Sequence, residues 1–450
     1  MHDPFVRKET SPRRFLLLQG LMGPFFRMVG IALRKSGHEV YKINFNGGDQ
    51  LFWRLPHGID YTGDGQHWPA FLEDVINRHQ ITDVMLFGDC RPMHKAAIEF
   101  CGERHIPVHV FEEGYIRPDW VTLEVDGVNG NSSLPRDPAW YRAEAARLPP
   151  APVHNTVPSS FRRRALEAVA YNAADILTRW YFHKWNDYRP WHPWTEGIGW
   201  LKRLRNRKAA EVLTQEIMQH ITDSGHPYML FPLQLDADAQ VRLHSSFAGM
   251  EPAIRRVISS FAAHAPSDTV LLIKEHPLDN GVRDWRSLIN DIAREHKVGD
   301  RVFYIETGDI ALLVQKARGV VTINSTTGTL ALACGVPVLA MGQAVYNIPD
   351  VTDQCDLDTF WVSPTPPDKA TYDAFRRVLI DRCLIPGGFF SEQGLKQLIQ
   401  GVLERISRSP APERIASEIV ASGTPHFRLH LPTRKPSRAS QPTVVTHDRV

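Results

Sequence analysis

The stretch from Val320 to Ala340 constrains the fold more than any other part of the chain. A short apolar run leads into the polar turn Asn324-Ser-Thr-Thr-Gly328. A helix of small residues follows, and a second apolar run spans Val336 to Met341. Short apolar runs on either side of a helix are typical of buried parallel strands joined by a crossover. The stretch therefore predicts an α/β fold, with the polar turn at the start of a helix.

This turn has two interpretations. Hydroxyl groups and free backbone N–H groups at a helix N-terminus bind anions. An ordinary capped helix carries the same residues, so the turn alone does not establish a ligand site. The decision depends on whether other polar residues are predicted to lie beside it.

Length and composition limit the alternatives. A chain of 450 residues is long enough for two globular domains, and its net charge of +2 excludes a general polyanion binder. The cysteines have no C-x-x-C spacing, which argues against a disulfide framework or a zinc site and fits reduced thiols. They are Cys90, Cys101, Cys334, Cys355 and Cys383.

No apolar run approaches the roughly 20 residues that span a membrane. The run that begins at Phe15 is interrupted by Gly20, Gly23 and Pro24, so it predicts neither a span nor a signal peptide. We expect a cytoplasmic protein, and any membrane contact that it makes is expected to be peripheral.

The first half of the chain predicts strands that end in polar residues or glycine. Such strands cover 15–19, 83–87 and 108–111, and in an open α/β sheet their carboxyl ends form the ligand edge. The glycine-rich loop after the first strand lacks a full G-x-G-x-x-G, so no dinucleotide is implied. The residues at these ends are Gln19, Gly20, Asp89, Arg91, Glu112, Glu113 and Tyr115.

The second half, from Tyr228 onward, repeats this organisation. Its strand ends carry Gln234, the run Lys274-Glu-His276-Pro277 and the turn described above. Two such halves face each other across a cleft, with carboxylates opposite a histidine, a lysine and a helix N-terminus. This arrangement predicts transfer of a group from an anionic donor. Asp236, Asp238 and His244 lack a diagnostic metal spacing, so a metal-free mechanism is favoured.

A block of basic and aromatic residues spans 161–208 and includes Arg162, Arg163 and Arg164. Basic and aromatic residues together are typical of a membrane surface contact. The alternative is a helical subdomain with a core of aromatic side chains and solvated arginines. A nucleic-acid interface is disfavoured, because no nucleic-acid-binding module surrounds the block.

We predict six segments from these patterns. They are a flexible N-terminus (1–13), an N-terminal Rossmann-like acceptor and catalytic domain (14–145), a connector with the basic-aromatic helical segment (146–222), a C-terminal Rossmann-like nucleotide-binding domain (223–385), a C-terminal helical segment (386–407) and a disordered tail (408–450).

Eight sequence blocks between about 15 and 400 form a recognisable set. They are Phe15-Leu-Leu-Leu-Gln-Gly with Pro24-Phe-Phe, Gly37-His-Glu-Val, Ile43-Asn-Phe-Asn-Gly-Gly-Asp, Phe87-Gly-Asp-Cys-Arg-Pro-Met-His, the run from Phe111 to Glu124, Phe231-Pro-Leu-Gln-Leu-Asp-Ala-Asp, Lys274-Glu-His-Pro and Asn324-Ser-Thr-Thr-Gly. Together they resemble the bacterial capsule polysaccharide biosynthesis proteins of the capsular Kdo-transferase type. The resemblance implies a GT-B glycosyltransferase that transfers Kdo from CMP-Kdo to a phosphatidylglycerol-type lipid at the inner face of the inner membrane. The protein would start the poly-Kdo linker used in capsule biosynthesis and export, with other capsule assembly proteins as partners.

Three short motifs are also similar to those of bacterial sialyltransferases, in which an acidic motif supplies the catalytic carboxylate and two others hold CMP. That similarity implies Glu112 or Glu113 as the carboxylate, and His276 with Ser325 and Thr326 as CMP ligands. The family retains the β configuration, so Asp89 and Asp119 are rival nucleophiles. No cofactor and no metal are expected beyond the CMP-Kdo donor. The donor-side candidates are Gln234, Lys274, His276, Pro277, Asn324, Ser325, Thr326, Thr327 and Gly328, and the other cleft candidates are Gln19, Gly20, Arg91, Tyr115 and Arg117.

Two further functions remain open on the sequence. One is a non-catalytic scaffold of the capsule export machinery, against which the intact carboxylate and His-Pro motifs argue. The other is an epimerase or transferase of similar architecture that acts on a UDP-sugar.

Overall fold

The computed structural model describes residues 12–151, 156–184, 191 and 193–408. The predicted disordered tail and most of the predicted flexible N-terminus lie outside these residues. Arg13, the last residue of the segment predicted to be flexible, is described, and it is buried and paired with Asp83.

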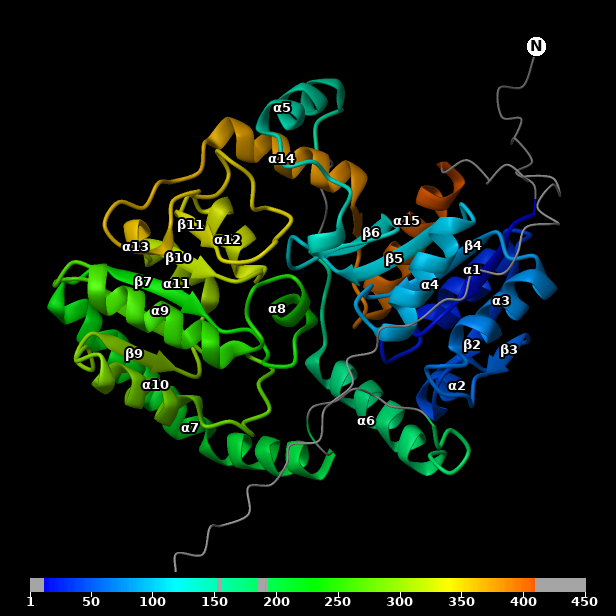
Figure 1. Ribbon diagram of the computed structural model, residues 1–450, viewed down its shortest axis with the longest axis horizontal. Helices are drawn as coiled ribbons and strands as arrows, with labels where there is room; N and C mark the ends of the chain where they lie inside the picture. The colour runs from blue at the N-terminus through cyan, green and yellow to red at the C-terminus, as the bar shows by residue number, and fades with distance from the viewer. Residues whose placement is uncertain (1–11, 152–155, 185–190, 192, 409–450) are drawn as a thin grey trace, which may run out of the picture. The chain divides into compact units, whose positions relative to one another are not determined.

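The first half of the chain forms a seven-stranded sheet in the order β12-β6-β5-β4-β1-β2-β3 (Figure 1). The strands from β3 to β5 are parallel, while β6 is antiparallel to both of its neighbours, β5 and β12. The strands are β1 (Arg14–Leu17), β2 (Glu39–Asn44), β3 (Gly58–Asp60), β4 (Asp83–Phe87), β5 (Val108–Glu113), β6 (Trp120–Val125) and β12 (Leu384–Pro386).

Side chains that alternate along these strands enter two different cores. Phe15 and Leu17 pack with residues of α1 and α15, whereas Leu16 and Leu18 pack with residues of α3 and α4. Because a strand has a period of two, these runs bury both faces of the sheet under helices. The helices of this half are α1 (Phe25–Lys35), α2 (Gly47–Trp53), α3 (Trp68–His79), α4 (Pro92–Glu103) and α15 (Glu392–Arg408).

The second half forms a five-stranded, wholly parallel sheet in the order β11-β10-β7-β8-β9. Its strands are β7 (Tyr228–Pro232), β8 (Val270–Lys274), β9 (Val302–Ile305), β10 (Gly319–Thr322) and β11 (Val338–Ala340). Its helices are α8 (Ala239–Leu243), α9 (Met250–His264), α10 (Trp285–Glu295), α11 (Ile310–Lys316), α12 (Thr327–Ala333) and α13 (Leu357–Phe360). The predicted strand–turn–helix–strand unit is therefore confirmed as β10, α12 and the parallel neighbour β11.

The remaining elements join the two halves. They are the 3₁₀ helix η1 (Asn129–Asn131) and the helices α5 (Pro138–Arg147), α6 (Phe161–Leu177), α7 (Pro193–Ser224) and α14 (Lys369–Arg382). After α14 the chain returns to the first sheet, where β12 pairs with β6 and α15 packs on α1. The predicted boundary at 385 thus falls inside a strand of the first sheet.

The predicted α/β class, with two doubly wound, mainly parallel sheets, is confirmed. Among the described residues, no helix is long and apolar enough to cross a membrane.

Candidate active site

A cavity of about 660 Å³ is lined by residues from the carboxyl ends of strands in both sheets. The first sheet contributes the loops after β1, β4 and β5, and the second contributes the loops after β7, β8 and β10. This is the ligand edge expected for open α/β sheets. The predicted site residues that line it are Gln19, Gly20, Asp89, Arg91, Glu112, Glu113, Tyr115, Arg117, Gln234, His276, Asn324, Ser325 and Thr326.

Glu113, at the end of β5, is held as a carboxylate by two arginines. Arg117 Nη1 lies 2.9 Å from one carboxylate oxygen, and Arg164 Nη2 lies 3.1 Å from the other. Burial acts to raise the pKa of Glu113, but the charges of Arg117 and Arg164 outweigh burial and lower it. Glu113 therefore stays ionised near neutral pH.

Glu112, its neighbour, has the opposite environment. Its carboxyl accepts a hydrogen bond from the Glu113 backbone N–H, which lies 3.0 Å from Oε1. Burial raises the pKa of Glu112 to about 7, and the nearby carboxylates of Glu113 and Asp238 add to the shift. Two adjacent carboxyls whose pKa values are pushed apart can divide the roles of proton carrier and fixed negative charge.

Replacing Glu112 with glutamine is expected to stabilise the protein at pH 8. Below pH 4.5, the ordinary pKa, the carboxyl is protonated in both the folded and unfolded chain. As the pH rises the unfolded chain loses this proton first, so the folded state loses stability until about pH 7. Glutamine removes that loss, which is worth about 1–3 kcal/mol at pH 8.

Urea unfolding of the wild type and the Glu112→Gln variant at pH 4 and pH 8 measures this difference. The gain should be present at pH 8 and absent at pH 4. An equal effect at both values would show that the carboxyl is not protonated by its surroundings.

His276, after β8, presents one defined nitrogen to the cavity. The backbone N–H of Leu278 donates to Nδ1 at 3.1 Å, so the neutral ring carries its proton on Nε2. Burial lowers the pKa of His276 to about 4, helped by Arg117 and Lys274. His276 is thus a neutral N–H donor near neutral pH, suited to an oxygen of a nucleotide phosphate.

The turn after β10 is fixed by hydrogen bonds to the loop after β7. The Asn324 backbone N–H donates to Gln234 Oε1 at 2.9 Å, and its side-chain amide donates to the carbonyls of Gln240 and His244. The Ser325 Oγ accepts from the Thr327 N–H at 3.2 Å. Asn324, Ser325 and Thr326 all line the cavity, but the backbone N–H and side-chain amide of Asn324 are already engaged in hydrogen bonds that fix the turn.

The helix that follows this turn contacts the loop that follows the acidic motif. Thr329 Oγ1, on α12, donates to the Tyr115 carbonyl at 2.8 Å. Tyr115 Oη in turn donates to Glu124 and accepts from the Asn129 N–H. The loop that follows Glu113 is thereby tied to the helix that follows the Ser/Thr turn.

Asp89, Cys90 and His244 form a cluster that joins the two halves. The Cys90 Sγ lies 3.1 Å from Asp89 Oδ1 and 3.2 Å from His244 Nε2. The other oxygen of Asp89 accepts from Val128 N–H and Asn131 Nδ2, both at 3.0 Å. Among the described residues, this is the one group whose ligand atoms lie close enough to hold a metal ion. In this structure the Cys90 thiol contacts both Asp89 and His244. The expectation of a metal-free site stays a prediction.

Five predicted residues do not line the cavity. Asp119 Oδ1 accepts from the Val157 N–H at 2.6 Å and its carbonyl accepts from Gly387, so it secures a connector and is not supported as a nucleophile. Lys274 Nζ is buried and donates to the Glu275 carbonyl at 3.1 Å. A Cβ at Gly328 would lie 2.4 Å from Tyr346 Oη, so this glycine serves packing. The others are Pro277 and Thr327.

The sequence did not identify the contribution of α6. Arg164, Tyr171, Asn172 and Asp175 line the cavity from one face of this helix. Their spacing of seven, eight and eleven residues is a helical-face signal, but nothing in the sequence indicates which element that face covers. Cys90 and Asp238 also line the cavity and were not predicted as site residues.

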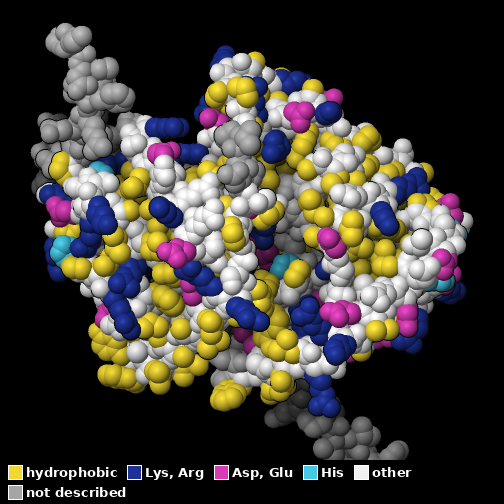
Figure 2. Space-filling view, turned by 180° about the vertical axis from the view of Figure 1, so that it is seen from behind, with side chains coloured by type: hydrophobic (Ala, Val, Ile, Leu, Met, Phe, Trp, Pro, Cys, Tyr) yellow, Lys and Arg dark blue, Asp and Glu magenta, His cyan; other side chains and the backbone are white. Residues whose placement is uncertain are grey.

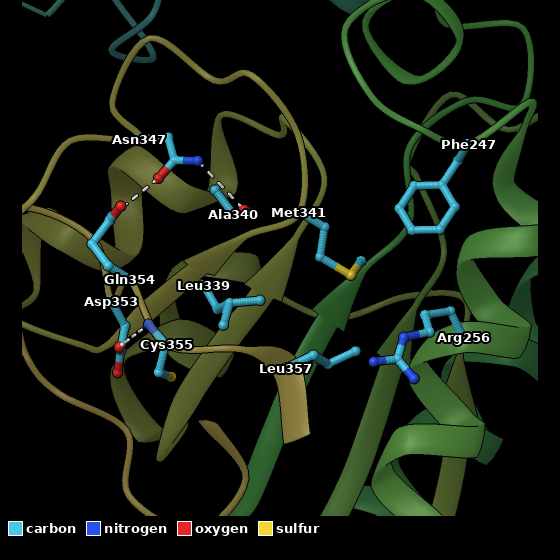
Figure 3. Close-up of a pocket in the computed structure, with 10 residues that line it drawn as sticks. All are labelled: Phe247, Arg256, Leu339, Ala340, Met341, Asn347, Asp353, Gln354, Cys355 and Leu357. Carbon is cyan, nitrogen blue, oxygen red and sulfur yellow. Dashed lines mark hydrogen bonds between the residues drawn. The ribbon is translucent and has the colours of Figure 1, made fainter. Parts of the chain in front are cut away.

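A second cavity, of about 340 Å³, lies at the β11 side of the second sheet (Figure 3). It is lined by Phe247, Arg256, Met341, Asp353 and other residues, none of which was predicted as part of the site.

Comparisons with known proteins agree with the family that the motifs suggested. Residues 82–390 match the family described as "Capsule polysaccharide biosynthesis protein". The chain is 35% identical over 371 residues to the capsule polysaccharide export protein KpsS of Escherichia coli, covering 82% of this chain and 95% of that protein. It is 35% identical over 401 residues to the capsule polysaccharide modification protein LipB of Neisseria meningitidis, covering 85% and 93%.

Among solved structures, the beta Kdo 2,7 transferase of Thermosulfurimonas dismutans KpsC overlaps with a TM-score of 0.41 at 13% identity, covering 88% of this chain and 100% of that one. The match to the family extends over more than half of the sequence, and it includes the acidic, His-Pro and Ser/Thr motifs of the cavity. The chain belongs to the capsule polysaccharide biosynthesis protein family.

Proposed function

We propose that this protein transfers Kdo from CMP-Kdo to a phosphatidylglycerol-type lipid at the inner face of the inner membrane, as a step of capsule polysaccharide biosynthesis. The observation that carries the proposal is the pair Glu112 and Glu113, with pKa values shifted in opposite directions, in one cavity with the His276 donor. The donor and acceptor follow from the resemblance of the motifs to Kdo transferases and sialyltransferases.

The two carboxyls would divide a retaining reaction. The ionised Glu113 attacks the anomeric carbon of Kdo, the bond to the phosphate breaks, and CMP leaves with the bonding electrons. The acceptor hydroxyl then displaces Glu113 from that carbon, and Glu112 takes the hydroxyl proton. Two displacements at the same carbon retain its configuration.

The leaving phosphate needs positive charge and hydrogen-bond donors. His276 Nε2–H and the guanidinium of Arg117, which is close enough to both Glu113 and His276 to shift their pKa values, would supply them. Ser325 and Thr326 add hydroxyl groups from the opposite sheet. No metal is required for this charge balance.

The test is incubation of the purified protein with radiolabelled CMP-Kdo and short-chain phosphatidylglycerol. We expect labelled lipid, with no loss of the product when EDTA is added. A scaffold would give no labelled lipid from any donor. A UDP-sugar enzyme would be stabilised against heat by UDP and not by CMP. Either result would contradict the proposal.

A further inference from the structure

Helix α6 presents an apolar stripe to solvent. Leu166, Val169, Ile176, Leu177 and Trp180 are between 54% and 80% exposed. Their spacing of three, four and seven residues places them along one side of the helix and its C-terminal extension. A stripe that would normally enter a core is here left uncovered by the described residues.

Helix α7 carries a second stripe of the same kind. Trp194, Ile198, Leu201 and Leu204 are between 64% and 78% exposed. Of the sixteen large hydrophobic side chains that are exposed in the described chain, twelve lie between residues 161 and 212. Scattered exposed apolar residues are normal, but a concentration of this kind marks an interaction surface.

Figure 2 shows hydrophobic side chains gathered along the lower edge of the molecule, the edge at which Figure 1 draws α6 and α7. Exposed basic side chains accompany the stripes, while no described acidic side chain between 161 and 208 is exposed. Apolar residues flanked only by positive charge are complementary to a bilayer with anionic headgroups. The exposed basic residues are Arg162, Arg179, Lys184, Lys202, Arg205, Arg207 and Lys208.

The opposite side of α6 is built into the cavity. Arg164 forms the ion pair with Glu113 at 3.1 Å, and Tyr171, Asn172 and Asp175 line the same cavity. Arg163 pairs with Glu167, so only Arg162 of the three consecutive arginines faces solvent. One helix thus has an apolar outer side and a catalytic inner side.

Helix α7 is connected to the other wall of the cavity. Arg203 Nη2 lies 2.9 Å from Glu275 Oε1, and the same guanidinium donates to the carbonyls of His276 and Asp279. A Cβ at Gly199 would lie 2.1 Å from the Asn280 carbonyl, so the helix and the loop 276–281 are in direct backbone contact. Arg203 therefore fixes the loop that carries the His276 donor.

We propose that the outer sides of α6 and α7 form one docking surface for an anionic lipid bilayer, and that docking fixes Arg164 and Arg203, which hold Glu113 and the His276 loop. The active site would thereby be ordered at the membrane, where the lipid acceptor is found. Docking itself does not depend on the proposed function. The benefit to catalysis rests on it.

Flotation with vesicles of phosphatidylcholine and phosphatidylserine tests the docking surface, since neither lipid is the proposed acceptor. The wild type should float, and 0.5 M NaCl should release part of it. Leu166→Gln, Val169→Gln and Trp180→Gln together should lower partitioning by about tenfold or more, because three apolar anchors are lost. The matched control carries Val125→Gln, Leu312→Gln and Val362→Gln, which are exposed apolar positions elsewhere, and it should float like the wild type.

A second variant addresses charge without touching the apolar stripe. It combines three charge reversals at exposed positions of α7, namely Lys202→Glu, Arg205→Glu and Lys208→Glu. This triple variant should no longer float with anionic vesicles. Wild-type flotation of both triple variants, each folded by circular dichroism, would overturn the docking surface. If the wild type floats and both triple variants do not, but the protein proves inactive with CMP-Kdo, the result would count against the proposed function and not against the docking surface.

Hydrogen exchange with the same vesicles tests the coupling. In the wild type, amides of 112–117 and 275–282 should exchange several-fold more slowly when vesicles are present. The Arg203→Met variant should float like the wild type. In this variant, vesicles should no longer slow amide exchange in 275–282, but they should still slow it in 112–117. Exchange in the wild type that does not respond to vesicles would overturn the coupling.

Discussion

Replacing Glu113 with glutamine is expected to reduce Kdo transfer by about 10³-fold or more, in the range found when a nucleophile or general base is removed. Glutamine keeps the size of the side chain but not the charge that balances Arg117 and Arg164. The amide is also too weak a nucleophile to attack the anomeric carbon. Single-turnover transfer of radiolabelled Kdo to short-chain phosphatidylglycerol measures the loss.

The control is Glu99→Gln, the same change at an exposed position of α4. Its activity should match the wild type, and both variants should melt cooperatively. Near-normal transfer by Glu113→Gln would remove Glu113 from the mechanism. A loss confined to Glu112→Gln, with Glu113→Gln active, would exchange the roles of the two residues.

The residues of this site could be predicted from the sequence because they follow apolar strands. A polar residue after a buried parallel strand lies at the ligand edge of the sheet, whatever the loops do afterwards. Asp89, Glu112, Glu113, His276 and Ser325 satisfy that condition, and all five line the cavity. Asp119 does not follow a strand of this kind. Its carboxylate instead anchors the Val157 connector.

What the sequence could not predict is the charge state of each carboxyl. Glu112 and Glu113 are adjacent and chemically identical. Their pKa values differ because only Glu113 forms ion pairs with Arg117 and Arg164. Arg164 belongs to a helix 51 residues away along the chain, and nothing in its sequence indicates that it turns inward while Arg162 turns outward. The return of β12 to β6 depends on long-range pairing in the same way.

The last prediction concerns nucleotide binding. Replacing His276 with alanine is expected to weaken CMP binding by about 10- to 100-fold, the effect of losing one hydrogen bond to a charged phosphate. Calorimetric titration with CMP measures it. His264→Ala, an exposed histidine of α9, is the matched control and should bind CMP like the wild type.

The pH dependence separates a neutral donor from a cationic one. Because the pKa of His276 is lowered to about 4, the ring stays neutral from pH 5 to pH 8, and the loss caused by alanine should be the same throughout that range. An imidazolium ligand would instead bind CMP more tightly as the pH falls through 6.5, and only the wild type would show that slope. A constant difference therefore supports a neutral His276 ring as the donor, and a difference that grows toward low pH contradicts it.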